Sequence, residues 1–140
     1  MKILVINGPN LNMLGVREPQ LYGKKTFSDL LSFINETASE NNVEVECFQS
    51  NSEGAIIDKI QSAYKVFDAL IINAGAYTHT SLAIADAIKS IGIVSIEVHL
   101  TDISKRESYR HFSFLKDVCV KTFAGFGFDS YKMAIEYLCK

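Results

Sequence analysis

The sequence predicts a flavodoxin-like α/β fold, a doubly wound sheet of five parallel strands in three α/β/α layers. Three observations predict it. Short apolar runs alternate with helical stretches along the chain. The clearest runs, 68–73 and 93–98, are almost continuously apolar, which is typical of strands buried on both faces of a parallel sheet. No linker, repeat or low-complexity tract interrupts the pattern, so we expect one domain over residues 1–140.

Each element follows from its own local pattern. The apolar runs predict strands near 2–7, 43–48, 68–73, 93–98 and 117–122. Apolar residues at helical spacing predict helices from 26 to about 40 and over 53–66, 81–91 and 128–139. We interpret these apolar stripes as core contacts rather than as functional grooves.

Polar residues and glycine mark the expected helix ends. Thr26 or Ser28 is a candidate N-cap for the first helix, and Thr78 for the third. Gly92 is expected to stop the third helix at its C-terminus.

Composition excludes several classes of function. Net charge is −2 and no Lys/Arg run is present, which argues against a nucleic-acid partner. No apolar run approaches the roughly 20 residues of a membrane span, and the short apolar run after Met1-Lys2 predicts a strand rather than a signal peptide. Cys47, Cys119 and Cys139 lack metal-like spacing, and the first two are expected to be buried thiols. A reducing cytoplasm fits this pattern.

Polar residues gather in the loops that follow the first four predicted strands. The first loop holds Asn10, Arg17 and Tyr22; the others span 49–54, 73–81 and 97–102. Ligands of open α/β sheets bind beyond the carboxyl ends of the strands. We therefore expect these loops to form the functional site.

The first loop indicates proton abstraction. A tyrosine is a poor base at neutral pH because its unperturbed pKa is about 10. A nearby guanidinium favours the phenolate, so Arg17 could make Tyr22 a usable base. The alternative is that both are packing or surface residues in a loop of ordinary turn residues.

Glu97 lies inside an apolar strand, where a buried carboxylate needs a partner. His99 is a candidate partner, and the pairing would orient its imidazole for acid–base chemistry. The alternatives are that His99 is a satisfied core histidine, that His79 satisfies a helix N-terminus, and that Asn73 caps a strand end. His111 falls outside these loops and is expected to be a surface or packing residue.

Other chemistries lack their motifs. His79 and His99 are far apart in sequence and lack a local ligand pair, so no metal site is expected. No phosphate-binding loop and no nucleophile elbow occur, so no cofactor is expected. Proton transfer by tyrosine and histidine is the favoured chemistry.

These loops together resemble one known family, type II 3-dehydroquinate dehydratase, over essentially the whole chain. The resemblance is carried by NGPNLNMLG at 7–15, REP at 17–19, YG at 22–23, QSNSEG at 49–54, NAGAYTHTS at 73–81 and EVHL at 97–100. It implies dehydration of 3-dehydroquinate to 3-dehydroshikimate in the shikimate pathway, on the route to chorismate and the aromatic amino acids. The family needs neither cofactor nor metal, and water leaves in the anti sense through an enolate.

The resemblance also implies catalytic roles. Tyr22 would remove the proton next to the ketone, and Arg17 would hold Tyr22 as phenolate. His99 would protonate the departing hydroxyl, held by Glu97. Asn10 would help bind a water that stabilises the enolate oxygen.

Substrate-binding roles follow from the same resemblance. The backbone amides of Leu100 and Thr101, with Asn73, would grip the substrate carboxylate. His79 and Arg110 would bind ring hydroxyls, with Arg106 as the competing arginine.

Assembly is implied as well. Asp86 would reach into the site of a neighbouring subunit, because the family forms trimers that assemble into dodecamers. Gly15 and Gly23 flank the loop that carries Arg17 and Tyr22, and we expect this loop to close over substrate as a lid.

The sequence departs from the family pattern at two positions. Asp102 stands where the family usually has Asn, and its charge could weaken binding of an anionic substrate if it points inward. Ala55 replaces an acidic residue, with only a local effect expected. The segment 104–114 fits the family less tightly.

Three other functions are alternatives to this one. A flavodoxin-like module could bind a nucleotide or flavin without catalysis, although the phosphate loop is missing. A scaffold could keep the fold without activity, although Arg17, Tyr22 and His99 are all present. A Schiff-base dehydratase would use a lysine on a much larger barrel.

Overall fold

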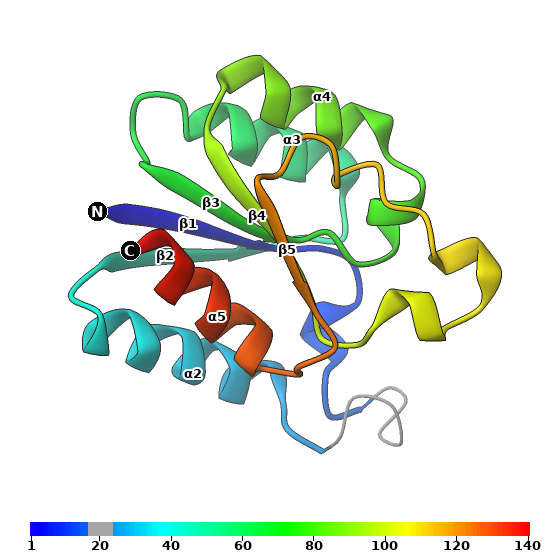
Figure 1. The fold of residues 1–140 in the computed structure, drawn as a ribbon, viewed down its shortest axis with the longest axis horizontal. Helices are drawn as coiled ribbons and strands as arrows, with labels where there is room; N and C mark the ends of the chain where they lie inside the picture. Colours follow the sequence, from blue (N-terminus) through cyan, green and yellow to red (C-terminus); the bar gives the residue numbers. More distant parts are fainter. Residues whose placement is uncertain (17–23) are drawn as a thin grey trace.

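The computed structural model describes residues 1–16 and 24–140, and contains one sheet of five parallel strands in the order β2-β1-β3-β4-β5 (Figure 1). The strands are β1 (Lys2–Asn7), β2 (Glu44–Gln49), β3 (Ala69–Asn73), β4 (Val94–His99) and β5 (Lys121–Ala124). The α-helices are α2 (Phe27–Glu40), α3 (Glu53–Ser62), α4 (Leu82–Ile91) and α5 (Asp129–Leu138). The predicted flavodoxin-like class is confirmed.

Helices cover both faces of the sheet. Figure 1 shows α2 and α5 against one face and α3 and α4 against the other. Along β1, Ile3 and Val5 belong to the α2/α5 core, whereas Leu4 and Ile6 belong to the α3/α4 core. This alternation follows from the two-residue period of a strand. Both faces of the central strands β1 and β3 are buried, which explains why these strands are almost continuously apolar, whereas the edge strands β2 and β5 are partly exposed.

The connection from β4 to β5 contains no α-helix. It contains two 3₁₀ turns instead, η3 (Ile103–Lys105) and η4 (Ser108–Arg110). The predicted strand at 117–122 is wrong in position, since β5 begins at Lys121. Leu115 is fully buried, and its carbonyl accepts the amides of Val118 and Cys119, so this apolar run forms a turn before the strand.

Several helix ends differ from expectation. Thr26, one of the two predicted N-caps of the first helix, forms a capping box with Asp29. Ser81 rather than Thr78 caps α4, because the Thr78 hydroxyl is used elsewhere. Gly92 ends α4 in the left-handed conformation with φ 64°, as predicted. Helix α3 ends at Ser62, earlier than the predicted 66.

The cysteines are free thiols. Cys47 and Cys119 are half-buried, and burial raises the pKa of Cys47 to about 11 and that of Cys119 to about 12. Both therefore remain protonated at neutral pH. No helix in residues 1–16 and 24–140 is long and apolar enough to cross a membrane.

The loops after β1 and β3 touch through their backbones. The amide of Gly8 donates to the carbonyl of Asn73 at 2.7 Å. A Cβ at position 8 would lie only 2.4 Å from the carbonyl oxygen of Ala74. Only glycine permits this approach, which brings two site-forming loops together.

We expect Gly8→Ala to lower the free energy of unfolding by about 2–3 kcal/mol, because a backbone oxygen cannot move aside cheaply. Gly54→Ala is the matched control, since its added Cβ has no neighbour closer than 3.9 Å. Urea unfolding measures both. Equal stability of the two variants would contradict the proposed constraint.

Candidate active site

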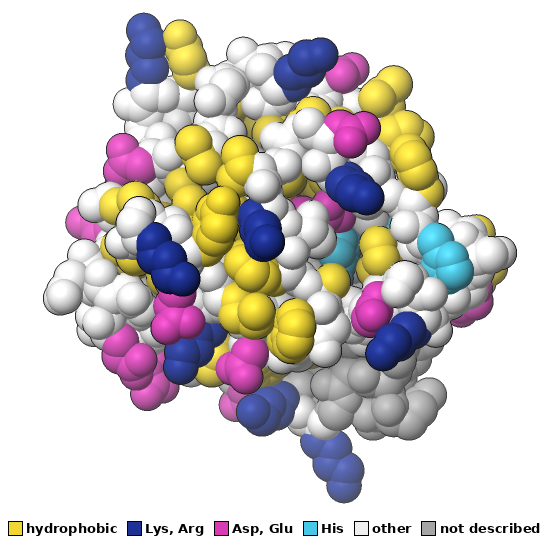
Figure 2. Space-filling view, in the orientation of Figure 1, with side chains coloured by type: hydrophobic (Ala, Val, Ile, Leu, Met, Phe, Trp, Pro, Cys, Tyr) yellow, Lys and Arg dark blue, Asp and Glu magenta, His cyan; other side chains and the backbone are white. Residues whose placement is uncertain are grey.

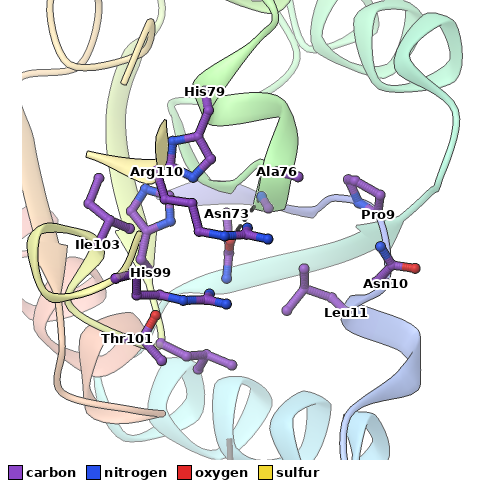
Figure 3. Close-up of a pocket in the computed structure, with 13 residues that line it drawn as sticks. Pro9, Asn10, Leu11, Asn73, Ala76, His79, His99, Thr101, Ile103 and Arg110 are labelled. Atoms are coloured by element: carbon purple, nitrogen blue, oxygen red, sulfur yellow. Dashed lines mark hydrogen bonds between the residues drawn. The ribbon is translucent and has the colours of Figure 1, made fainter. Parts of the chain in front are cut away.

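A pocket lies at the carboxyl edge of the sheet, between the loops that follow β1, β3 and β4 (Figure 3). Figure 2 shows histidine on this face of the molecule, one at the bottom of a hollow. The pocket is lined by Pro9, Asn10, Leu11, Asn73, Gly75, Ala76, His79, His99, Leu100, Thr101, Ile103, Arg106 and Arg110. Two arginines and two histidines make it suited to an anionic ligand.

His99 and Glu97 form a buried pair on β4. They are two residues apart on one strand, so their side chains lie on the same face of the sheet. His99 Nε2 lies 2.5 Å from Glu97 Oε2, with His99 only 5% and Glu97 only 1% exposed. A carboxylate accepts hydrogen bonds, so His99 Nε2 carries the hydrogen. Nδ1 is then the ring nitrogen left for a ligand.

Three hydroxyls also reach the Glu97 carboxylate. Thr78 donates to Oε2 at 2.8 Å, Ser113 to Oε2 at 2.7 Å, and Thr122 on the neighbouring strand to Oε1 at 3.4 Å. Burial by itself raises the pKa of Glu97. The hydrogen bond and charge of His99, with the hydroxyls of Ser113 and Thr78, outweigh burial and hold that pKa below its ordinary value.

His79, Arg106 and Arg110 line the same pocket, and Figure 3 shows the side chains of His79 and Arg110 at it. His79 Nδ1 donates to the carbonyl of Phe112 at 2.7 Å, which leaves Nε2 for a ligand. Burial lowers the pKa of His79, and the positive charges of His99 and Arg110 add to this effect. Because its pKa lies below the ordinary value, His79 is a neutral polar group at physiological pH. Arg110 Nε pairs with Glu107 Oε2 at 3.0 Å.

Asn73 connects the pocket to the core. Its Nδ2 donates to the hydroxyl of Tyr131 at 2.9 Å, and its Oδ1 accepts the amide of Gly75 at 3.1 Å. The Tyr131 hydroxyl donates in turn to Asn7 Oδ1 at 2.5 Å. Asn73 thus caps the end of its strand, which is the alternative predicted for it from sequence. It also lines the pocket.

The second loop braces the first. Asn10 has φ 71°, and its amide donates to Asn51 Oδ1 at 3.0 Å. Gln49 Nε2 donates to the carbonyl of Gly8 at 3.2 Å. Asn51 also accepts the hydroxyl of Tyr77 at its carbonyl, at 2.7 Å. The loop at 49–54 therefore supports the loops after β1 and β3. None of its residues is among the described residues that line the pocket.

The structure brings most predicted residues together. Those lining the pocket are Asn10, Asn73, His79, His99, Leu100, Thr101 and Arg110, with Glu97 behind His99. Asp86 is exposed on α4 and does not line the pocket. Arg17, Tyr22 and the expected lid between Gly15 and Gly23 lie outside the described residues or at their border.

Other predictions concern the β4–β5 connection. Both Arg106 and Arg110 line the pocket, so the choice between them stays open. Asp102 turns its carboxylate to Ser104, accepting from its amide at 3.0 Å and its hydroxyl at 2.6 Å. These bonds lower the pKa of Asp102. His111 is exposed, as expected.

Ser113 and Thr122 are not among the site residues that the sequence predicts, and Thr78 is predicted only as a helix cap in a site-forming loop. Their only signal is the buried Glu97, which requires donors but does not identify them. Among the described residues, no group of three or more His, Cys, Asp or Glu side chains could hold a metal ion.

Fold and site define an α/β protein with a buried histidine–glutamate pair beside a pocket lined by two arginines. The chain belongs to the family described as Dehydroquinase class II, whose model matches residues 1–139. It is 52% identical over 138 residues to a 3-dehydroquinate dehydratase of Clostridium acetobutylicum, covering 99% of this chain and 96% of the relative.

Solved structures agree with this membership. A type II dehydroquinase from Butyrivibrio crossotus has a TM-score of 0.98 and 52% identity, covering 100% of this chain and 98% of its own. One from Propionibacterium acnes has a TM-score of 0.95 and 39% identity, covering 99% and 95% respectively.

The Glu97 site predicts a particular dependence of stability on pH. The folded pKa of Glu97 is below its unfolded value of about 4.3, so its contribution is complete above that pH and is lost as pH falls through the folded pKa. We expect the stability of Glu97→Gln to fall less steeply below about pH 4.3. Urea unfolding across this range is the measurement. Glu36→Gln, on the exposed face of α2, should follow the wild type; parallel curves for all three proteins would contradict the prediction.

Proposed function

We propose that this chain dehydrates 3-dehydroquinate to 3-dehydroshikimate in the shikimate pathway, which leads to chorismate and the aromatic amino acids. The observation that carries the proposal is the His99–Glu97 pair beside a pocket lined by two arginines. Membership of the class II dehydroquinase family identifies the substrate class. A hydroxy-carboxylate with a ketone would be an anion, which suits these cations.

The elimination separates into two proton transfers. Tyr22, held as phenolate by Arg17, removes the proton next to the ketone, and the electron pair moves onto the ketone oxygen as an enolate. The enolate then re-forms the ketone and expels the hydroxyl group. His99 gives that group its proton, so it leaves as water. Glu97 supports His99 in its cationic state because the two groups share a hydrogen bond.

Lowering the pKa of a tyrosine by about two to three units requires roughly 3–4 kcal/mol of differential stabilisation. A close, partly desolvated guanidinium can supply this amount. The enolate oxygen needs a preorganised donor, typically worth about 3–4 kcal/mol. Asn10, which lines the pocket, would hold a water for this purpose.

The remaining lining residues would hold the substrate. The amides of Leu100 and Thr101, with Asn73, would bind its carboxylate at the carboxyl end of β4. His79 and Arg110 would bind ring hydroxyls. His79 Nε2 suits a hydroxyl group because Nδ1 already donates to Phe112.

We further propose an assembly of trimers into a dodecamer in the cytoplasm. Asp86 lies exposed on α4, where it could reach a neighbouring subunit's site. The free thiols of this chain suit a reducing compartment.

The first test is absorbance of the conjugated enone formed from 3-dehydroquinate, measured in the presence of chelator and without added cofactor. We expect a rise with wild-type protein and a loss of at least about a hundredfold in rate for Tyr22→Phe, because the base is removed. A rise that survives in Tyr22→Phe would contradict the role of Tyr22. No rise from folded wild-type protein would contradict the function.

The two arginines are distinguished by steady-state kinetics. We expect Arg110→Ala to raise KM about tenfold or more, which corresponds to about 1.4 kcal/mol, because a charged hydrogen bond to the substrate is lost. Arg106→Ala serves as the matched comparison, since it lines the same pocket. A larger effect from Arg106→Ala would reverse the assignment.

A further inference from the structure

Three segments of the chain meet at the Glu97 carboxylate. Thr78 comes from η2 (Gly75–His79), Ser113 from the β4–β5 connection, and His99 from β4. All three donate to the same oxygen, Oε2. Glu97 is 1% exposed, so these bonds form away from water, where they are strong and where the loss of one is costly.

Ser113 is the only one of these donors contributed by the β4–β5 connection. Its hydroxyl oxygen also accepts the amide of Leu115 at 3.1 Å, which aligns the hydroxyl hydrogen towards Glu97. Ser113 does not line the pocket, so it does not contact a bound substrate there. Its hydroxyl also lies 3.3 Å from the Thr78 hydroxyl, which itself donates to Glu97, so both of these contacts lead to the same carboxylate.

The segment 112–114 is held against η2 by two further hydrogen bonds. The amide of Phe114 donates to the carbonyl of Thr78 at 2.8 Å, and His79 donates to the carbonyl of Phe112 at 2.7 Å. These bonds do not depend on the Ser113 hydroxyl. Removing that hydroxyl takes a donor from Glu97 and the acceptor from the Leu115 amide, while these two bonds keep the segment against η2.

We propose that Ser113 is a positioning residue for the acid–base pair: its hydroxyl holds the Glu97 carboxylate in the orientation that directs His99 Nε2 inward and leaves Nδ1 for the substrate. The inference rests on the proposed function, in which His99 is the acid. Ser113 links the connection that carries Arg110 to the pair that transfers the proton. Substrate binding and proton donation thus share one anchor.

The test is Ser113→Ala with two companion variants. Ser113→Thr retains a hydroxyl. Ser95→Ala is the matched control, because Ser95 is a fully buried serine on the same strand as Glu97 whose hydroxyl donates to the carbonyl of Ile93 instead. Urea unfolding of each variant confirms that kinetics are measured on folded protein.

We expect Ser113→Ala to lower kcat about fivefold, the effect of one lost hydrogen bond of about 1 kcal/mol, with KM changed less than about twofold. Ser113→Thr should recover most of kcat, and Ser95→Ala should keep the wild-type kcat. An unchanged kcat for Ser113→Ala, or an equal loss for Ser95→Ala, would overturn the proposal.

A substrate-free measurement separates this inference from the proposed function. Carbon-13 NMR of glutamate carboxyls, with Glu97 assigned by its loss in Glu97→Gln, should show that Glu97 titrates at higher pH in Ser113→Ala than in wild type. Ser95→Ala should leave that titration unchanged. If the wild-type protein shows no dehydratase activity but Ser113→Ala still shifts the Glu97 titration, the hydrogen bond from Ser113 is retained and the proposed reaction is rejected. An unshifted Glu97 titration in Ser113→Ala would reject the anchor whatever the activity.

Discussion

The buried carboxylate of Glu97 is the interaction on which the site depends. An ionised group inside an apolar sheet is costly unless donors surround it. Here a histidine and the hydroxyls of a turn, a connecting segment and a neighbouring strand supply them. The need to solvate one charge therefore determines where several separate segments lie. The same charge orients the histidine that faces the pocket.

The absence of an α-helix in the β4–β5 connection is related to this charge. A helix packed over β4 would normally present apolar side chains to the sheet. The α3/α4 face of β4 instead carries Ser95, Glu97 and His99, which require polar contacts. A connection built from η3 and η4 can supply hydroxyl and arginine side chains from irregular backbone. The polar composition of β4 and the irregular connection thus fit each other.

Much of this arrangement was predictable from sequence. Short, mostly apolar runs predict the first four strands, and a carboxylate within one of them requires a partner such as His99. The start of β5 was not predictable, because the apolar residues near Leu115 bury themselves in a turn rather than in a strand. The sequence predicts Thr78 as a helix N-cap, since a threonine before a helix usually serves that purpose. Only the folded chain shows that its hydroxyl satisfies Glu97.

Serine and threonine are too common for Ser113 and Thr122 to be distinguished by type or spacing. Their importance comes from long-range contacts, 16 and 25 residues from Glu97 in sequence. Local patterns carry no information about such contacts. The positions of Asn10, Asn73 and His79 were easier to anticipate, because the carboxyl ends of parallel strands meet at one edge.

The Tyr131 hydroxyl joins Asn7 and Asn73, the last residues of two adjacent central strands. Tyr131 belongs to α5, which is translated after every loop that lines the pocket. A nascent chain that has left the ribosome only as far as β5 would already contain the His99–Glu97 pair. It would still lack Tyr131, whose hydroxyl accepts a hydrogen bond from Asn73 Nδ2. The pocket is therefore completed only after α5 has been made, so that a ligand meets its finished form only after the whole sheet has been covered.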